Sequence, residues 1–177
     1  MQFRQVIGHP ALAEKLRELY QQNRLAHALL FLGGEGVGAL PLALAFAQYL
    51  LCEKQRTEGL AAAQQVSLFE AAAPPSRKGE APEKDACGVC PSCIKVAQLI
   101  HPDLHFSYPV IPKKSGEKPV STDYITEWRD FMSTQPFGNV YDWLQHIGAE
   151  NKQGNITAAE CNDIIRKISM KSYEGSY

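Results

Sequence analysis

The stretch FLGGEGVGALPLALAFAQYLL, residues 31–51, has the layout of a phosphate-binding loop that leads into a helix. The apolar run at 28–32 stops at two glycines, which predicts a short buried strand. Residues 40–51 are rich in Ala and Leu and are long enough for a helix. Residues 10–22 place leucines at helical spacing before the run. The expected order is therefore helix, strand, glycine loop, helix.

The glycine loop keeps the backbone pattern of a phosphate cradle and lacks its charged chemistry. Aligned on G-x-x-x-x-G-K-[ST], it offers Gly33, Gly36 and Gly38, but Ala39 and Leu40 replace the Lys and the Ser or Thr. Without the cation a triphosphate would face only backbone dipoles, and without the hydroxyl Mg²⁺ would lose a ligand. We predict a vestigial cofactor site with little or no ATP binding and no hydrolysis. The alternative is that these glycines only make a tight turn.

The bulk composition restricts the class of protein. A length of 177 residues favours one domain, with room for a small attached module. A formal net charge of −1 gives no electrostatic sign of a nucleic-acid or membrane partner. No apolar run approaches the roughly 18 residues of a membrane span, and the N-terminus has no apolar signal core. We therefore expect a cytoplasmic protein whose five cysteines do not form disulfides.

The rest of the chain is predicted to be mostly helical. Beyond the glycine loop, helices are expected within 91–103, 121–136 and 157–170, and alternation of apolar residues in 103–110 indicates a strand. Residues 53–86 change to a mixture of Ala, Gln, Pro and both charge signs. This segment is predicted to be an insertion, helical around 60–69 and otherwise a flexible loop.

Three closely spaced cysteines indicate a metal site. Cys87, Cys90 and Cys93 have C-x-x-C-x-x-C spacing, which aims three thiolates at one point. The fourth ligand has to come from elsewhere, and we favour Cys52, at the end of the helix after the glycine loop. The four cysteines are predicted to hold a structural Zn²⁺, with no position left for water.

Other readings of these residues stay open. His101 is the weaker candidate for the fourth ligand, and Cys161 is expected in the core-facing side of a helix. An iron–sulfur cluster is compatible with the same ligands, and a redox Cys-x-x-Cys pair is the less favoured alternative. His27 is expected to be a packed core residue.

Five motifs share their order and spacing with one known family. They are Ile7, Gly8 and His9; Leu25, His27, Ala28, Phe31, Gly33, Gly36 and Gly38; Leu50, Leu51 and Cys52; the CGVCPSC cluster; and His101, Pro102 and Asp103. As a set they resemble the N-terminal AAA+ domain of bacterial clamp-loader subunits, most of all the delta-prime subunits of DNA polymerase III. The resemblance covers 6–52 and 87–106.

The resemblance implies a fold class and a domain organisation. The fold would be α/β, a P-loop NTPase (AAA+) N-terminal domain over 1–177, with a truncated parallel sheet and flanking helices. A zinc-binding module would be inserted at 52–100, with its flexible loop at 53–86. The family continues into the acidic Walker B strand, sensor 1 and a Ser-Arg-Cys motif, none of which this chain contains, so it looks like a fragment.

The resemblance also implies a role in DNA replication. The chain would be a non-catalytic clamp-loader subunit of the DNA polymerase III holoenzyme, supporting the loading of the sliding clamp onto primed DNA. Its partners would be the gamma/tau and delta subunits and, through the assembly, the clamp and primed DNA, with no membrane. No ATPase activity is expected. The alternatives are an ATP-hydrolysing, gamma/tau-like subunit and a free-standing zinc-binding interaction module.

Overall fold

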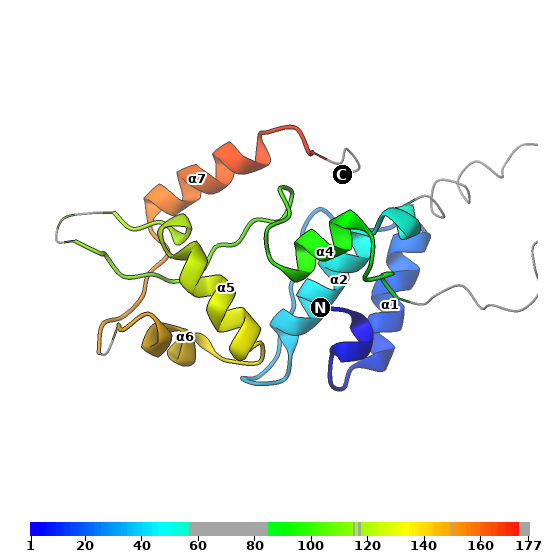
Figure 1. Cartoon of the computed structure of the whole chain (residues 1–177), viewed down its shortest axis with the longest axis horizontal. Coiled ribbons are helices and arrows are strands. Elements are labelled where there is room, and N and C mark those ends of the chain that lie inside the picture. The colour runs from blue at the N-terminus through cyan, green and yellow to red at the C-terminus, as the bar shows by residue number, and fades with distance from the viewer. Residues whose placement is uncertain (57–84, 115, 117, 150, 174–177) are drawn as a thin grey trace, which may run out of the picture. The chain divides into compact units, whose positions relative to one another are not determined.

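The computed structural model describes residues 1–56, 85–114, 116, 118–149 and 151–173 (Figure 1). The described chain divides into two compact units. Unit 1 consists of Met1–Leu32 and Ala39–Ala97, and unit 2 consists of Gly33–Gly38 and Gln98–Tyr177. The predicted helix at 60–69 and most of the predicted loop at 53–86 lie outside the described residues.

Unit 1 is built from helices around one apolar core. Its elements are η1 (Phe3–Gln5), α1 (Pro10–Gln21), α2 (Ala39–Leu51), a helical segment at 53–56, and α4 (Pro91–Ala97). Pro10 begins α1, where its fixed φ suits the first turn and its missing N–H costs nothing. The buried core comprises Phe3, Val6, Ala13, Leu42, Ala45, Phe46 and Tyr49. The predicted helices at 10–22 and 40–51 are therefore confirmed.

Unit 2 is organised around stacked aromatic side chains. Its helices are η2 (Ser121–Tyr124), α5 (Ile125–Thr134), α6 (Val140–His146) and α7 (Ala158–Ile168). The Tyr108 and Trp128 rings stack with centroids 4.1 Å apart, and Trp143 lies edge-on to both. Burial of these large rings contributes apolar stabilisation to unit 2.

The predicted α/β fold is wrong for the part of the chain that the structure describes. These residues contain helices, turns and extended segments but no strand and no parallel sheet, and hence no P-loop NTPase sheet. Within the described ranges, an antiparallel bridge joins Val110 and Asn155. Residues 28–32 are not part of any strand among the described residues, and Leu30 and Leu32 are 85% and 88% exposed. A buried strand requires partner backbone on its edges, and no described segment supplies it.

The strand predicted at 103–110 is also absent, although its alternation of apolar residues is seen in the structure. Along 104–110 side chains alternate between more and less exposed, as the apolar period of two predicts, with Tyr108 and Val110 buried. The Tyr108 N–H, however, donates to the Ser121 hydroxyl at 3.0 Å, and Tyr108 also accepts from that hydroxyl through its carbonyl. The backbone of Tyr108 is therefore bonded to a side chain, and only Val110, through its bridge to Asn155, has a paired backbone as in a ladder.

Candidate metal centre

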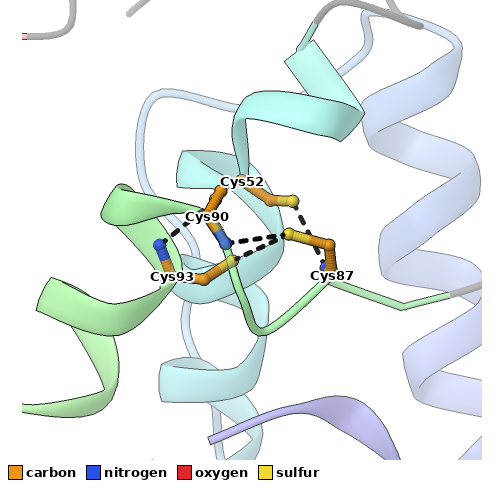
Figure 2. Close-up of side chains that lie close together, drawn as sticks. All are labelled: Cys52, Cys87, Cys90 and Cys93. Atoms are coloured by element: carbon orange, nitrogen blue, oxygen red, sulfur yellow. Dashed lines mark hydrogen bonds between the residues drawn. The ribbon is translucent and has the colours of Figure 1, made fainter.

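Four cysteines come together in unit 1. Cys52 directly follows α2, Cys87 and Cys90 lie in the segment before α4, and Cys93 is in the first turn of α4. Their Sγ atoms all lie within 4.8 Å of one another, as Figure 2 shows. The Sγ atoms of Cys87 and Cys93 are 3.9 Å apart. A zinc–sulfur bond of about 2.3 Å places tetrahedral ligands about 3.8 Å apart, so the spacing suits Zn²⁺.

Backbone N–H groups point at the sulfur atoms. The N–H of Cys87 donates to Cys52 Sγ, that of Cys90 to Cys87 Sγ and that of Cys93 to Cys90 Sγ, each at 3.4 Å (Figure 2). Such donors favour the thiolate over the thiol, because they interact better with negative charge. The loop is thus folded to hold anionic sulfur, which is the form that binds a metal.

Without a cation the sulfur atoms must share protons. The hydrogen bond from the Cys93 thiol lowers the pKa of Cys52, and the backbone N–H of Cys87 contributes in the same direction. The same contact raises the pKa of Cys93, and burial raises the pKa of Cys90. Replacing the shared protons with one divalent cation neutralises the buried sulfur atoms together, so metal binding releases protons.

The site is partly enclosed, and polar side chains beside the ligands support it. Cys52 and Cys93 have no exposed surface. The Glu53 carboxylate accepts from the N–H and hydroxyl of Ser92, both at 3.3 Å, at the start of α4. Gln48 donates to the Cys93 carbonyl at 3.3 Å. With four sulfur ligands and two of them fully buried, the arrangement fits a structural ion and leaves no obvious position for substrate.

The supporting glutamines were missed by sequence reasoning. Gln2, Gln48 and Gln55 are 7%, 2% and 5% exposed, and each donates to a backbone carbonyl in unit 1. Glutamines are mostly exposed in proteins, so nothing in the sequence indicates that a particular glutamine is buried.

The less favoured fourth ligand, His101, is not in the cluster. His101 is buried, and its Nδ1 accepts from the Asp103 N–H at 3.1 Å. Two expectations of burial are corrected by the structure. Cys161 was expected in a core and is exposed on α7. His27 was also expected in the core and is exposed, since the segment that carries it forms no buried strand.

The glycine loop is held by residues of unit 2. Gly36 and Gly38 have φ values of +73° and +87°, in the region that favours glycine. A Cβ on Gly38 would lie 3.1 Å from the Phe137 ring. The Glu35 carboxylate accepts from the Asn139 side chain at 3.1 Å. The loop therefore has tight turns and an internal negative charge, and Glu35 is satisfied by the protein.

The described helices include none with the length and apolar character needed to cross a bilayer.

Comparison with known proteins gives one family. Residues 8–74 match the family model described as DNA polymerase III, delta subunit. The matched range contains the glycine loop, α2 and Cys52, and its last part lies outside the described residues. No curated protein and no solved structure matches the chain significantly. The resemblance to clamp-loader subunits is thereby confirmed over residues 8–74, where the chain matches the DNA polymerase III delta-subunit family.

Proposed function

We propose that this chain is a non-catalytic, delta-prime-like clamp-loader subunit of bacterial DNA polymerase III, acting in the cytoplasm. The observation that carries the proposal is the match of residues 8–74 to the delta-subunit family, in a segment whose glycine loop continues into Ala39 and Leu40. A subunit without the Lys and the hydroxyl at these positions contributes protein contacts to the assembly, while ATP is hydrolysed elsewhere.

Assembly with other subunits tests the role directly. The chain is mixed with purified gamma/tau and delta subunits and analysed by size-exclusion chromatography with light scattering. We expect the chain to enter a complex of defined stoichiometry. The negative control is the same chain after unit 1 has been unfolded. Failure to join any complex at micromolar concentrations contradicts the proposal.

Nucleotide titration separates this role from that of an ATP-hydrolysing subunit. Calorimetric titration with MgATP is expected to show no saturation below about millimolar concentration, since the cation and the metal-binding hydroxyl are missing. The variant Ala39→Lys with Leu40→Thr is the matched comparison, because it restores only these two groups. Micromolar affinity of the natural chain would instead support the gamma/tau-like alternative.

We further propose that the four cysteines hold a structural Zn²⁺. The support is the sulfur spacing, the three N–H···S contacts and the burial of Cys52 and Cys93. Elemental analysis of protein purified without chelator is expected to give about one zinc per chain. Iron with visible absorption, or less than about half an equivalent of zinc, would contradict this assignment.

A free-standing zinc-binding interaction module remains the second candidate. It is favoured by one observation: the described residues contain no parallel sheet, although the metal centre is complete. Such a module would bind zinc and would not join the clamp-loader subunits. The assembly experiment therefore decides between the two.

A further inference from the structure

The N-terminal turn, defined here as residues 2–6, is attached to the segment that enters the metal centre. The Asp85 carboxylate accepts from the Phe3 N–H at 3.1 Å through Oδ1 and from the Arg4 N–H at 3.0 Å through Oδ2. Gln2 Nε2 donates to the Ala86 carbonyl at 2.5 Å. Residues 85 and 86 directly precede the ligand Cys87, so these bonds end one or two residues from the metal site.

The turn is also packed closely against the ligand segment. A Cβ on Gly88 would lie 2.8 Å from Gln2 Nε2, so the Gln2 side chain occupies the space beside the Cys87–Cys90 turn. The Oε1 of Gln2 accepts from Nε and Nη2 of Arg4 at 3.0 and 2.7 Å, which orients its amide toward Ala86. Gln2 is 7% exposed, and breaking its bond would leave the Ala86 carbonyl without this buried partner.

The ligand segment has little secondary structure of its own. Between residues 85 and 90 it forms bends and no helix, and α4 begins only at Pro91. Its position is set by Cys87 and Cys90 and by the bond from Gln55 Nε2 to the Asp85 carbonyl, 3.3 Å long. A metal ion that fixes both cysteines would therefore also fix the acceptors that hold the N-terminal turn.

The N-terminal turn also contributes Phe3 to the apolar core of unit 1. Phe3 is 6% exposed, and its ring centroid lies 5.7 Å from that of Tyr49 and 6.4 Å from that of Phe46. The Arg17 guanidinium lies over the same ring, 5.3 Å from its centroid. Release of the turn would expose Phe3 and uncover part of α2.

We infer that occupancy of the four-cysteine site and docking of the N-terminal turn are one coupled equilibrium, with Asp85 and Gln2 as the positioning residues that connect them. The inference rests on the proposed metal site. Because coupling is reciprocal, the metal stabilises the docked turn, and the docked turn raises the affinity for the metal by the same factor.

The first test is hydrogen exchange of the full chain, with zinc bound and after chelation. Zinc removal is expected to speed exchange of the 3–6 amides about tenfold or more. In Asp85→Ala with zinc bound, the same amides exchange faster while α2 amides keep their protection, which separates release of the turn from unfolding of unit 1. Unchanged exchange of residues 3–6 on zinc removal would overturn the inference.

The second test measures the reverse effect on zinc affinity. Asp85→Ala and Gln2→Met are titrated against a chromophoric chelator, and each is expected to bind zinc about 10-fold more weakly, as for other residues that orient metal ligands. The matched control is Asp123→Ala, whose carboxylate accepts from the Val120 N–H at 3.1 Å at the start of η2 in unit 2. Its zinc affinity is expected to stay unchanged.

The outcomes test the coupling separately from the proposal that the four cysteines bind zinc. Stoichiometric zinc binding with equal affinity in the natural chain, Asp85→Ala and Gln2→Met leaves the metal site intact and refutes the coupling. A chain that binds no zinc refutes both. Exchange protection of the α2 amides verifies that unit 1 of Asp85→Ala and Gln2→Met is folded, and fluorescence of the two tryptophans verifies the fold of unit 2 in Asp123→Ala.

Discussion

Tyr108 shows how a single residue anchors the core of unit 2. Its hydroxyl donates to the Ser121 carbonyl at 2.8 Å, and its ring stacks on Trp128. Burial raises the pKa of Tyr108, and the negative charges of Glu127 and Glu160 act in the same direction. The neutral phenol is therefore the form that the folded unit holds.

This shift makes the contribution of Tyr108 depend on alkaline pH. The folded pKa lies above the unfolded value of 10.0, so the stabilisation is fully present below pH 10 and is lost as pH rises toward the folded pKa. Tyr108→Phe is expected to cost about 0.5–1.5 kcal/mol at pH 8 and less at pH 11, because the variant has no phenol to ionise. Urea unfolding followed by tryptophan fluorescence measures both values.

Tyr141→Phe is the control for this titration, since Tyr141 is 67% exposed. It should change the unfolding free energy little at either pH. If the unfolding free energy lost in Tyr108→Phe is larger at pH 11 than at pH 8, the pKa of Tyr108 is not raised in the folded protein.

The cysteines provide the second prediction at the residue scale. Cys52→Ser removes one of four clustered ligands, and the zinc content is expected to fall below about half an equivalent after dialysis against a weak chelator. Cys161→Ser is the matched control, because Cys161 is an exposed free thiol outside the cluster. Equal zinc in the two variants would show that Cys52 is not a ligand.

Among the secondary-structure elements, several helices formed where capping and periodicity predict them, whereas the two predicted strands did not form. α7 begins where Thr157 accepts from the Glu160 N–H at 3.3 Å, as its capping spacing predicts. α6 was missed, although Asn139 and Asp142 exchange cap hydrogen bonds of 2.9 Å at its start, a signal readable in the sequence. Capping and periodicity are local properties, which is why they are predictable from short stretches.

The glycine loop gives a prediction for one element. Gly36 and Gly38 both have positive φ, so an alanine at either position costs about 1–2 kcal/mol of backbone strain. Only at Gly38 would the new Cβ also meet the Phe137 ring, at 3.1 Å, while at Gly36 it meets nothing within 4 Å. We expect Gly38→Ala to destabilise unit 2 more than Gly36→Ala, measured by urea unfolding with tryptophan fluorescence. Equal costs would show that the Phe137 contact is absent in solution.

At the scale of the whole molecule, the metal centre and the tryptophans belong to different units. All four cysteines lie in unit 1, and Trp128 and Trp143 lie in unit 2. Each unit has its own apolar core, as the buried clusters around Tyr49 and around Trp128 show. The metal is therefore expected to stabilise one unit and not the other.

Thermal unfolding with two probes tests this division. Addition of a strong chelator is expected to lower the temperature of a far-UV circular dichroism transition from the helices of unit 1. The transition seen by tryptophan fluorescence should keep its midpoint. A single transition that moves equally in both probes would mean that the two units unfold together.

Two helices and the grouping of three cysteines were predictable from the amino-acid sequence alone. Residues 10–22 and 40–51 have the periodicity or the composition of a helix, and C-x-x-C-x-x-C spacing brings three sulfur atoms together over a few residues. Which extended runs have partners, and which side chains are buried, became known from the packed structure. Leu30 and Leu32 are exposed, and Gln48 is buried beside Cys93. Strand pairing and burial depend on distant backbone, whereas a helix satisfies its own hydrogen bonds within four residues.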